Sequence, residues 1–569
     1  MSRIAHSLET LADQQTYDLV VLGTGAGGMA AALFGAINGA KVLLVESSAY
    51  VGGTSALSGG TTWVPLSDFK TSQQEDSYEK VSEFLDNAVG ELSPKGHRDA
   101  FLNTGAKAIR TLVNHTDVDF RLCPFHPDYM ADLEGATESG RALEPLPFIT
   151  RHLKEDLALL RPPIPEFTVL GGMMVNRFDI NHLLARFQSL SSFIYSGQLV
   201  MRYAIDKLRF GQTARSVMGH ALIARMLSSI KQQPNITLVM NTQTEAIASL
   251  SHGEHQLSLN QKGVKRQIVA AKGVVFASGG FSHHPDKRRS FYPRTVSELS
   301  PAAEGNQGKA QTLAESLGAV YGEEYDQAAF WAPCSRRKRA DGSMAMFPHF
   351  VFDRSKPGTL CVNSEGHRFV NESLSYHEFG KAMHQQTGAV YIIADHAAIQ
   401  KYGLGIVRLG GDNLAPYLKD GYLIKGNTLA ELAHKLKVPA ANLEASVADI
   451  NQAAASGVDT TFGRGSNVYQ RANGDPSHSP NPTLGALSQG PFYAVKLEVT
   501  DIGSARGLKT TAQAQLVNQQ GQPLDGLYAC GNDLHSIMGG RYPGPGITIG
   551  PAIVFAYLAT QHALKSNHH

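Results

Sequence analysis

The fold of this chain is decided by the stretch Tyr17-Asp-Leu-Val-Val-Leu-Gly-Thr-Gly-Ala-Gly-Gly28. An apolar run typical of a buried strand passes directly into a G-x-G-x-x-G turn, and the helical stretch Met29–Asn38 follows it. A second strand is predicted over Lys41–Val45, and it ends at Glu46. This order, a strand, a glycine turn, a helix, a second strand and an acid, is typical of a dinucleotide-binding unit. We therefore expect the turn to bind a dinucleotide. The pyrophosphate would lie at the helix N-terminus and the acid would bind the ribose hydroxyls.

Further glycine-rich segments favour FAD as the dinucleotide. The chain contains 56 glycines, many of them in pairs, which suggests that the backbone approaches a large ligand closely. The segment Gly52-Gly-Thr-Ser-Ala-Leu-Ser-Gly-Gly60 is suited to line the path of the isoalloxazine and the phosphates. The residues predicted to contact FAD are Gly23, Gly25, Ala26, Gly27, Gly28, Glu46, Ser47, Gly53, Thr54, Ser55, Ser58, Gly59, Gly60, Ala246, Ala277, Ser278, Gly279, Gly531, Asn532, Thr548 and Ile549.

Later strands indicate that the dinucleotide domain is built from both ends of the chain. Asn235–Met240 and Thr244–Ile247 are predicted as a strand and its continuation. Gly273–Gly280 and Gly526–Asn532 are predicted as strands that end in glycine. Strands that converge on one cofactor in this way are typical of a parallel, doubly wound sheet. The first strand and the last helix must therefore meet, and the domain is discontinuous.

The predicted fold class is α/β, with a Rossmann-like discontinuous FAD-binding domain and an α+β capping or catalytic domain. The first part of the FAD-binding domain is expected over residues 1–289, the capping domain over 290–490, and the C-terminal part of the FAD-binding domain over 491–569. Residues 115–215 are rich in proline, aromatic residues and methionine, and they are expected to form an insertion. The sequence leaves open whether this insertion lies beside the active site or packs as a flap.

Composition limits the classes of partner. The chain has 569 residues, 42% hydrophobic and 18% charged, and its 51 basic and 50 acidic side chains nearly cancel. This balance indicates a globular protein and does not indicate a nucleic-acid partner. The four cysteines are scattered and show no spacing typical of disulfides or of a zinc site. We therefore expect no metal site, and we expect a reducing, cytoplasmic location. No transmembrane segment or signal peptide is predicted, whereas peripheral membrane contact stays open.

The C-terminal segment Met538-Gly-Gly-Arg-Tyr-Pro-Gly-Pro-Gly-Ile-Thr-Ile-Gly-Pro-Ala552 predicts the chemistry. It places the phenol of Tyr542 and the backbone N–H of Gly546 four residues apart on a turn rich in glycine and proline. The apolar run Pro551–Ala559 predicts that the turn opens a helix, whose N-terminus adds positive dipole. Two such donors can hold one carbonyl oxygen and make the carbon beside a ketone acidic.

Together these segments resemble the 3-ketosteroid Δ1-dehydrogenase branch of the succinate dehydrogenase/fumarate reductase flavoprotein superfamily. The resemblance covers essentially the whole chain. It includes the glycine segments at the N-terminus, the block Leu360-Cys-Val-Asn-Ser-Glu-Gly-His-Arg-Phe-Val-Asn-Glu-Ser-Leu-Ser-Tyr376, and the closing GLYACGN and GGRYPGPGITIGPA motifs. It implies an FAD-dependent 3-oxosteroid 1-dehydrogenase whose electron acceptor is not readable from the sequence. One departure is the pair His283-His284, where relatives more often carry an acid and an amide.

The resemblance implies a role for each of four residues. Tyr542 and Gly546 match the pair that binds the ketone oxygen, and Tyr376 matches the tyrosine that removes the proton beside the ketone. Tyr129 matches the tyrosine that supports this base. Hydride from the β-carbon would pass to flavin N5. Because an unperturbed phenol has a pKa of about 10, activity is expected to rise toward alkaline pH.

Three other readings stay open at this point. The same desaturation could act on a smaller cyclic ketone such as 4-oxocyclohexanecarboxylate, in which case a cation should pair with the carboxylate. A fumarate-reductase-like enoate reductase would need an arginine proton donor, whereas the closing motif offers a phenol and glycines. A flavin-binding electron carrier or scaffold without turnover would have no use for the donors of this turn. Arg541, next to Tyr542, is left without a role.

Overall fold

The glycine turn joins β2 (Gln15–Leu22) to α1 (Ala26–Ile37) in the computed structural model, which describes residues 4–69, 76–351, 353–409 and 413–565. The Val/Leu-rich end of β2 is buried, as is expected of a central parallel strand. α1 is rich in alanine and is buried from Ala26 to Ala36. The predicted strand–turn–helix–strand unit is thus confirmed.

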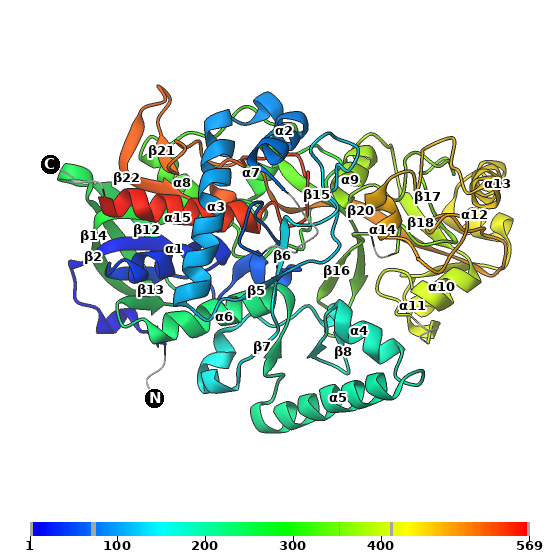
Figure 1. Cartoon of the computed structure of the whole chain (residues 1–569), viewed down its shortest axis with the longest axis horizontal. Coiled ribbons are helices and arrows are strands. Elements are labelled where there is room, and N and C mark those ends of the chain that lie inside the picture. The colour runs from blue at the N-terminus through cyan, green and yellow to red at the C-terminus, as the bar shows by residue number, and fades with distance from the viewer. Residues whose placement is uncertain (1–3, 70–75, 352, 410–412, 566–569) are drawn as a thin grey trace.

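The strands around this unit form a nine-stranded sheet (Figure 1). Its strand order is β1-β11-β3-β2-β14-β13-β12, and β22 also pairs with β14 while β21 pairs with β22. The neighbours from β1 to β14 are parallel, as is the β14–β22 pair, while β12, β13 and β21 are antiparallel to theirs. The strands are β1 (Ala5–His6), β3 (Val42–Val45), β11 (Ile236–Val239), β12 (Gln243–Ser249), β13 (His255–Gln261), β14 (Val264–Phe276), β21 (Gln515–Val517) and β22 (Pro523–Ala529).

The two ends of the chain meet on this sheet, so the predicted discontinuous domain is confirmed. The C-terminal helix α15 (Ile549–Lys565) lies beside α1 and α3 (Lys95–His115) (Figure 1). Phe34 of α1 and Tyr557 of α15 pack edge to face, with ring centroids 4.9 Å apart. Other helices of this half are α2 (Tyr78–Ala88), α6 (Met218–Gln232), α7 (Pro285–Phe291) and α8 (Lys309–Ser316).

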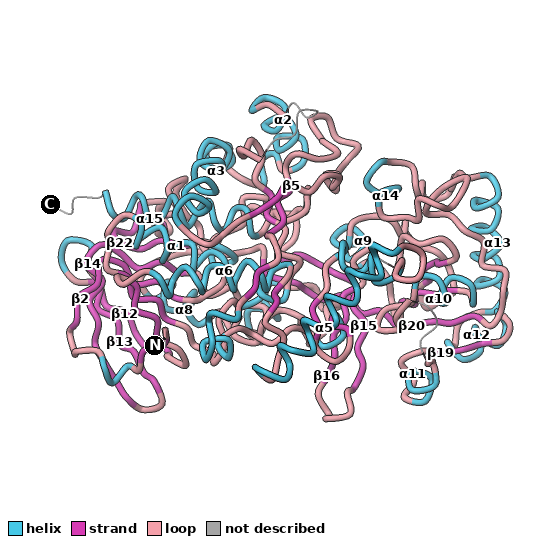
Figure 2. The backbone as a smooth tube through the Cα atoms, turned by 60° about the horizontal axis from the view of Figure 1, so that its bottom comes forward, coloured by secondary structure: helices cyan, strands magenta, loops and turns pink. Residues whose placement is uncertain are grey.

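A second, six-stranded antiparallel sheet forms the cap domain. Its strand order is β16-β15-β20-β18-β17, and β19 also pairs with β20. Figure 2 shows the first sheet at one end of the molecule and the cap helices α10, α12 and α13 at the other. The cap elements are β15 (Ala329–Lys338), β16 (Met344–Pro348), β17 (Thr359–Val362), α9 (Tyr376–His384), β18 (Val390–Ala394), α10 (His396–Tyr402), α11 (Ala415–Lys419), β19 (Ile424–Gly426), α12 (Leu429–Leu436), α13 (Ala440–Ser456), α14 (Val468–Ala472) and β20 (Phe492–Ser504).

The long strand β20 connects the two predicted domains. It begins just after the boundary expected at residue 490, yet it pairs with β15 and β18 of the cap sheet. The chain therefore leaves the cap only after β20. A division near residue 504 matches this pairing, and the exact boundary stays a proposal.

The segment predicted as an insertion contains short strands and two helices. It comprises β5 (Phe120–Leu122), β6 (Ala142–Pro145), β7 (Phe148–Ile149), β8 (Thr168–Val169), β9 (Met173–Met174), α4 (Arg177–Leu184), α5 (Leu190–Phe210) and β10 (Arg215–Ser216). β6 pairs with β4 (Thr62–Trp63), which ties the segment to the first half of the chain. The segment at β9 and the helix α5 share a small core of their own, formed by Met173, Val175, Leu199 and Tyr203, and Leu183 of α4 packs against it.

The state of the cysteines, the hydropathy of the helices and the short 3-10 helices complete the description of the fold. The four cysteines are unpaired and buried. Among the helices that the structure describes, none combines the length and hydropathy needed to cross a membrane. Short 3-10 helices lie at η1 (Leu8–Thr10), η2 (Gly53–Leu57), η3 (Gly90–Leu92), η4 (Arg151–Leu159), η5 (Pro165–Phe167), η6 (Ser251–Gly253) and η7 (Gly531–Asp533).

Candidate active site

The glycine turn between β2 and α1 is packed so closely that it excludes side chains. Gly23 has a φ of +109°, and a Cβ atom there would lie 2.3 Å from the carbonyl oxygen of Ala277. A Cβ atom on Gly28 would lie 2.0 Å from the carbonyl oxygen of Gly23. Gly25 is the N-cap residue of α1 and makes no side-chain bond to it. The N-terminus of α1 is therefore a bare backbone cradle, which suits the phosphates of a dinucleotide.

Glu46 lies just after β3, where the ribose-binding acid is expected. Its Oε2 accepts hydrogen bonds from the hydroxyl of Thr24 at 2.5 Å and from the N–H of Thr24 at 3.2 Å. These bonds hold the carboxylate beside the glycine turn. The carbonyl oxygen of Ser47 accepts from Gln243 Nε2 at 3.4 Å, and Ala246 is an exposed residue three positions further along β12. Their contacts with FAD stay a prediction.

The segment after β3 packs against the first turn of α1. The N–H of Ala26 donates to Ser55 Oγ at 3.2 Å. Thr54 Oγ1 accepts from Asn306 Nδ2 at 2.9 Å, which connects this segment to a loop before α8. The remaining predicted contact residues of the segment lie on the same turn, namely Gly53, Ser58, Gly59 and Gly60.

β14 and β22 end side by side, and a buried carboxylate joins their ends. The hydroxyl of Ser278 donates to Asp533 Oδ1 at 3.1 Å, and the N–H of Gly280 donates to the same oxygen at 2.9 Å. Burial raises the pKa of Asp533 above its ordinary value. Asp533 was not predicted, although its position directly after the GN pair of the closing motif was a signal. The predicted residues at these two strand ends are Ala277, Ser278, Gly279, Gly531 and Asn532.

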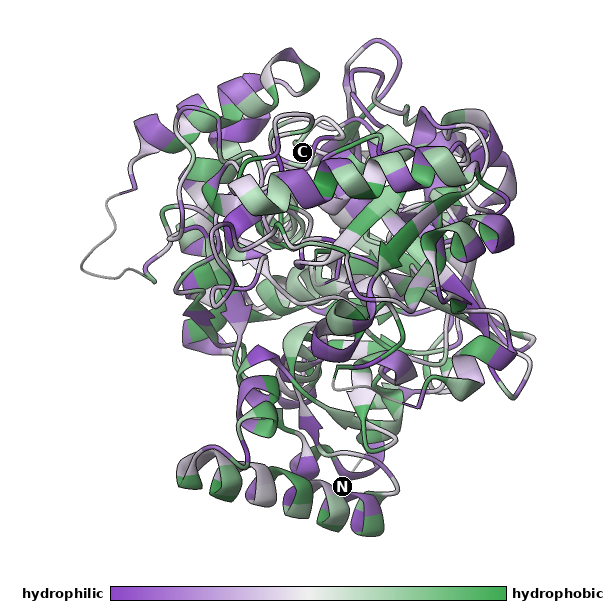
Figure 3. Ribbon diagram, turned by 90° about the vertical axis from the view of Figure 1, so that its right-hand side faces the viewer, coloured by the Kyte–Doolittle hydropathy of each residue, from purple (hydrophilic) through white to green (hydrophobic). Residues whose placement is uncertain are grey.

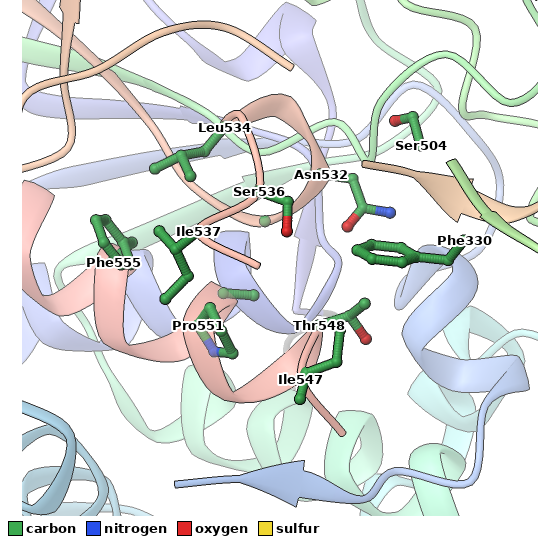
Figure 4. A pocket seen from close by; sticks show the side chains of 12 residues that line it. Phe330, Ser504, Asn532, Leu534, Ser536, Ile537, Ile547, Thr548, Pro551 and Phe555 are labelled. Atoms are coloured by element: carbon green, nitrogen blue, oxygen red, sulfur yellow. The ribbon is translucent and has the colours of Figure 1, made fainter. Parts of the chain in front are cut away.

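A pocket lies between η7 and the start of α15 (Figure 4). Asn532, Thr548 and Phe330 surround the pocket, and Ser536 lines it from the loop between η7 and α15 (Figure 4). Ile549 is the first residue of α15, so Thr548 stands at the helix N-terminus. Because Phe330 also packs edge to face on Tyr542, at 5.2 Å between ring centroids, the pocket adjoins the predicted catalytic turn.

Three tyrosines predicted from three distant segments meet at one point. The ring centroids of Tyr376 and Tyr542 are 5.0 Å apart, and those of Tyr129 and Tyr376 are 5.7 Å apart. Tyr129 and Tyr542 lie nearly parallel, with their ring centroids 5.6 Å apart. The hydroxyl of Tyr376 lies near enough to the other two hydroxyls for both to influence its pKa. The structure thus brings together the groups that the sequence placed on separate elements, while their roles remain predictions.

The loop that carries Tyr129 is tied to the C-terminal turn. The N–H of Tyr129 donates to the carbonyl oxygen of Pro543 at 2.7 Å. The neighbouring Asp128 is buried, and it accepts from Trp63 Nε1 at 3.0 Å and from Arg141 at 2.8 Å. These bonds fix the backbone beside Tyr129 and connect it to the turn that carries Tyr542.

Gly546 occupies a position that only glycine fills easily. Its φ is +88°, and a Cβ atom there would lie 2.3 Å from the carbonyl oxygen of Thr61. Its own carbonyl oxygen accepts from the N–H of Trp63 at 3.1 Å and from that of Gly550 at 3.0 Å. The Gly546 N–H donates to no acceptor among the described residues. A donor on a fixed turn is therefore left for a ligand.

Burial shifts the titration of Tyr376, Tyr542 and His377 toward their neutral forms. Burial raises the pKa of Tyr376 well above its ordinary value, and neighbouring Tyr129 and Tyr542 raise it further. The pKa of Tyr542 is also raised by burial, although hydrogen bonds with Tyr376 and Thr548 offset part of the rise. Burial lowers the pKa of His377 to about 3, so this imidazole is neutral. Tyr376 is the first residue of α9, where the helix dipole favours a phenolate.

Buried charges hold the loop before Tyr376. Glu372 pairs with Arg368 through two bonds of 3.0 Å, and Arg368 pairs with Asp459 at 2.8 Å. Arg354 donates to the carbonyl oxygens of Glu372 at 2.6 Å and Leu374 at 3.3 Å. The acid of the Asn-Glu-Ser-Leu-Ser-Tyr motif therefore anchors the loop rather than facing a substrate.

A fourth tyrosine lies in the cluster and was not predicted. Tyr469 of α14 packs against Tyr129 with ring centroids 4.8 Å apart. Its hydroxyl is buried and has no hydrogen-bond partner among the described residues. Phe350 packs against Tyr376 at 4.9 Å. Neither residue belongs to a recognisable motif, so only the packing of the cap against the first domain could identify them.

The basic groups next to the cluster are neutral or already bonded. Besides its bonds to the loop, Arg354 donates to the carbonyl oxygen of His349 at 2.9 Å. Arg541 donates to the carbonyl oxygen of Ala88 at 3.0 Å. Burial lowers the pKa of His126, which is beside Tyr129, to about 4. His283 contacts the carbonyl oxygen of Ala302.

Comparison with known proteins places this geometry in a family. The family model described as "FAD binding domain" matches residues 18–549. The chain is 34% identical to the 4-oxocyclohex-2-ene-1-carboxylate 5-dehydrogenase of Sinomonas cyclohexanicum, over 95% of this chain and 92% of the relative. It is 31% identical to the 3-oxosteroid 1-dehydrogenase of Mycolicibacterium smegmatis, over 96% of each chain.

The chain belongs to the FAD-binding-domain family.

Among solved structures, the 3-ketosteroid Δ1-dehydrogenase of Sterolibacterium denitrificans superposes on this member of the family with a TM-score of 0.89. It is 29% identical, and the match covers 96% of this chain and 99% of that one. This family member is an FAD-dependent oxidoreductase related to dehydrogenases of cyclic ketones.

The residues of the cradle fit FAD. A Cβ atom on Gly25 would meet only Ser55 Oγ, at 3.8 Å, so the first turn of α1 has open space beside it, as the approach of a pyrophosphate requires. Glu46 keeps a lone pair for a ribose hydroxyl, since a carboxylate has about four acceptor sites. The pocket beside Asn532 and Thr548 lies between this cradle and the tyrosines. The family member would therefore hold its cofactor between the first sheet and the cap.

Proposed function

We propose that the protein removes two hydrogens from a 3-ketosteroid at its C1–C2 bond. One observation supports this proposal above all. Tyr542, Tyr376 and Tyr129 converge from three remote segments, and the turn that carries Tyr542 also carries the free N–H of Gly546. Such a set offers two donors for a carbonyl oxygen and a separate phenol for the proton beside it.

Each residue has a distinct task in this proposal. Tyr542 and the Gly546 N–H donate to the C3 oxygen and stabilise its negative charge as the C2–H bond breaks. The oxygen of Tyr376 accepts the C2 proton, while Tyr129 stabilises the phenolate by hydrogen bonding. FAD held at the glycine turn would supply the acceptor for the hydride from C1, and the electron pair of the broken C2–H bond would become the new double bond. Two donors of this kind are each worth about 3 kcal/mol to the transition state.

The surroundings support a neutral, apolar substrate. Phe330 and Phe350 flank the tyrosines, and Tyr469 adds a third aromatic wall. Arg354 is committed to carbonyl oxygens of its own chain, and His377 is neutral because burial lowers its pKa to about 3. A steroid ring system gains from apolar walls and needs no counter-ion.

The test is turnover of a 4-ene-3-ketosteroid by the FAD-loaded protein with an artificial electron acceptor. We expect the 1,4-diene product, identified by its mass and by NMR of ring A. Tyr542→Phe should lower kcat by roughly 10²–10³-fold with FAD retained, because one oxyanion donor is lost. Absence of any product with steroids, or an unchanged kcat in the variant, would contradict the proposal.

A second candidate is dehydrogenation of a cyclohexanone or cyclohexenone carboxylate. The 34% identity to the Sinomonas enzyme favours it. The cation that would bind the carboxylate is Arg541, whose buried Nε has no hydrogen-bond partner among the described residues and lies 3.7 Å from Asp326.

Arg541→Met separates the two candidates. If the substrate is a carboxylate, the variant should lose turnover of 4-oxocyclohexanecarboxylate by raising KM. If the substrate is a steroid, the variant should keep kcat/KM for the steroid within about threefold, because a rim charge contributes little to binding of a neutral ligand.

A further inference from the structure

The helix α5 buries its polar side and exposes its apolar side. Its buried residues are Ser192, Ser196, Leu199, Tyr203 and Asp206. They are spaced by three or four residues, so they form one stripe along the helix. Three of the five carry hydroxymethyl or carboxylate groups. An ordinary surface helix would place such groups in water and its apolar residues against the protein.

Large apolar side chains occupy the opposite face of α5. Leu208 is 89% exposed, Leu190 75%, Met201 61% and Phe193 56%. At about 100° per residue, these residues together with Ile194, Val200 and Ile205 fall within an arc roughly 140° wide. Figure 1 shows α5 along the lower edge of the molecule, and in Figure 3 hydrophobic green recurs along the helix at the same edge.

The apolar face continues onto α4 and the turn that follows it. Phe187 in this turn is 81% exposed, and Phe178 and Leu184 of α4 are 50% and 53% exposed. Of the 19 large hydrophobic residues that are exposed in the described chain, 12 lie between residues 170 and 208. Apolar exposure gathered in one place marks an interaction site, whereas scattered exposure does not.

The exposed charges of this unit all have one sign. Its exposed basic residues are Arg177, Arg186, Arg202, Lys207 and Arg209.

Both acidic residues of the unit are buried and paired inside the protein. Asp179 accepts two bonds of 3.0 Å from Arg215, and Asp206 accepts one of 2.7 Å from Arg151. On the helical wheel, Arg202 and Arg209 lie at one border of the apolar arc of α5 and Lys207 at the other.

We propose that α4, α5 and the turn between them dock the protein on an anionic lipid surface. The apolar arc of α5 enters the boundary between headgroups and acyl chains. The flanking guanidinium and ammonium groups bind lipid phosphates there, and their aliphatic stems lie along the apolar layer. Charge complementarity selects this occupant, since a second copy of the chain would bring like charges together.

The docking unit is attached to the wall of the tyrosine site. Glu166, just before β8, forms a two-bond pair with Arg339 of the cap at 2.7 and 2.8 Å. Phe167 stacks on Phe347 of β16 at 5.0 Å, and three residues later Phe350 packs on Tyr376. Docking would thus hold the site close to a lipid phase that dissolves apolar ketones. This advantage rests on the proposed function, whereas docking itself does not.

The experiment is flotation of the full-length, FAD-loaded protein with vesicles. We expect it to float with vesicles of mixed phosphatidylglycerol and phosphatidylcholine, and less with phosphatidylcholine alone. A triple variant with Phe193→Ser, Met201→Ser and Leu208→Ser should bind the anionic vesicles at least about tenfold more weakly. The matched control changes exposed apolar residues elsewhere, at Leu250, Met344 and Val458, to serine and should bind like the parent.

A second variant tests the charges. Arg202→Gln, Lys207→Gln and Arg209→Gln together should weaken binding to anionic vesicles about tenfold or more and leave binding to phosphatidylcholine unchanged. Unchanged FAD absorbance and melting temperature confirm that each variant is folded. The proposal is overturned if the parent does not float, or if the apolar variant floats like its control. It is also overturned if the apolar variant changes only the oligomeric state in sedimentation, because a second copy would then cover the face.

Discussion

The tyrosine site and the α4–α5 surface place polar and apolar groups in opposite ways. In the site, Tyr376 and Tyr542 bring hydroxyl groups into an aromatic interior, where they are 7% and 5% exposed. On the surface, α5 presents Leu208 and its neighbours to solvent and buries Asp206. Each arrangement costs stability if the chain is considered alone. The comparison teaches where to look for ligands: under the two proposals, the buried hydroxyls are reserved for a reacting carbonyl and the exposed apolar residues for a partner surface.

The largest effect expected is on the base of the tyrosine site. Tyr376→Phe should lower kcat by roughly 10²–10⁴-fold, because the proton acceptor is lost while the ring packing remains. Turnover with an artificial electron acceptor measures it. Tyr203→Phe on α5 is the matched control, since its hydroxyl bonds only to the carbonyl oxygen of Leu170 at 3.1 Å. A similar loss in both variants would show that the effect is structural.

The second prediction concerns the backbone donor. Gly546→Ala should reduce kcat by about 10²-fold, because the Cβ atom meets Thr61 and displaces the N–H from the carbonyl oxygen. Gly521→Ala is the control, since Gly521 has a φ of +75° with no atom within 4 Å of its Cβ position. Both variants carry backbone strain, so equal losses of activity would rule out a specific donor role.

The third prediction is a pH profile of kcat/KM. In the proposed mechanism the active form carries Tyr376 as a phenolate, and burial raises the pKa of this phenol well above its ordinary value. The active fraction therefore grows as pH rises, about tenfold per unit while pH stays below that pKa. We expect a continued rise from pH ~7 to ~9. A plateau beginning near pH ~7 would assign the proton to a group such as histidine instead.

The smallest effect expected is on the stability of α5. Asp206→Ala removes the acceptor for Arg151 and for the N–H of Ala214, and it should cost about 1–3 kcal/mol in unfolding free energy. Leu208→Gln on the opposite face should change it by less than about 0.5 kcal/mol. Urea denaturation of both variants measures the difference. A larger loss for Leu208→Gln would show that the apolar face is packed within the protein.

Much of the fold followed from local sequence pattern. The buried run before Gly23, the alanine-rich helix after it and the strand ending at Glu46 are confirmed. α12 (Leu429–Leu436) is likewise set by its local sequence, because its apolar spacing and its Thr428 cap agree. Such elements depend on neighbouring residues, so a linear pattern suffices to predict them.

The candidate site was predictable only in part. Tyr542, Tyr376 and Tyr129 stand in motifs that can be recognised, and the structure brings them together. Asp533 and Tyr469 lie outside any predicted motif. Their importance depends on contacts with strands and loops far away in sequence, such as the bond between Asp533 and Gly280. The extension of the cap sheet through β20 likewise depends on strand pairing, which no local pattern encodes.

By itself, the sequence determined that a glycine turn would open a dinucleotide domain, and that a phenol and a bare N–H would stand on one C-terminal turn. These properties follow from backbone sterics and the spacing of a few residues. Only the tertiary structure decided which tyrosines pack against one another and which side of α5 faces water. An amphipathic pattern gives a helix two sides but not their direction. Here Arg151 holds Asp206 of α5 on the inner side of the helix, so the apolar side of α5 faces outward.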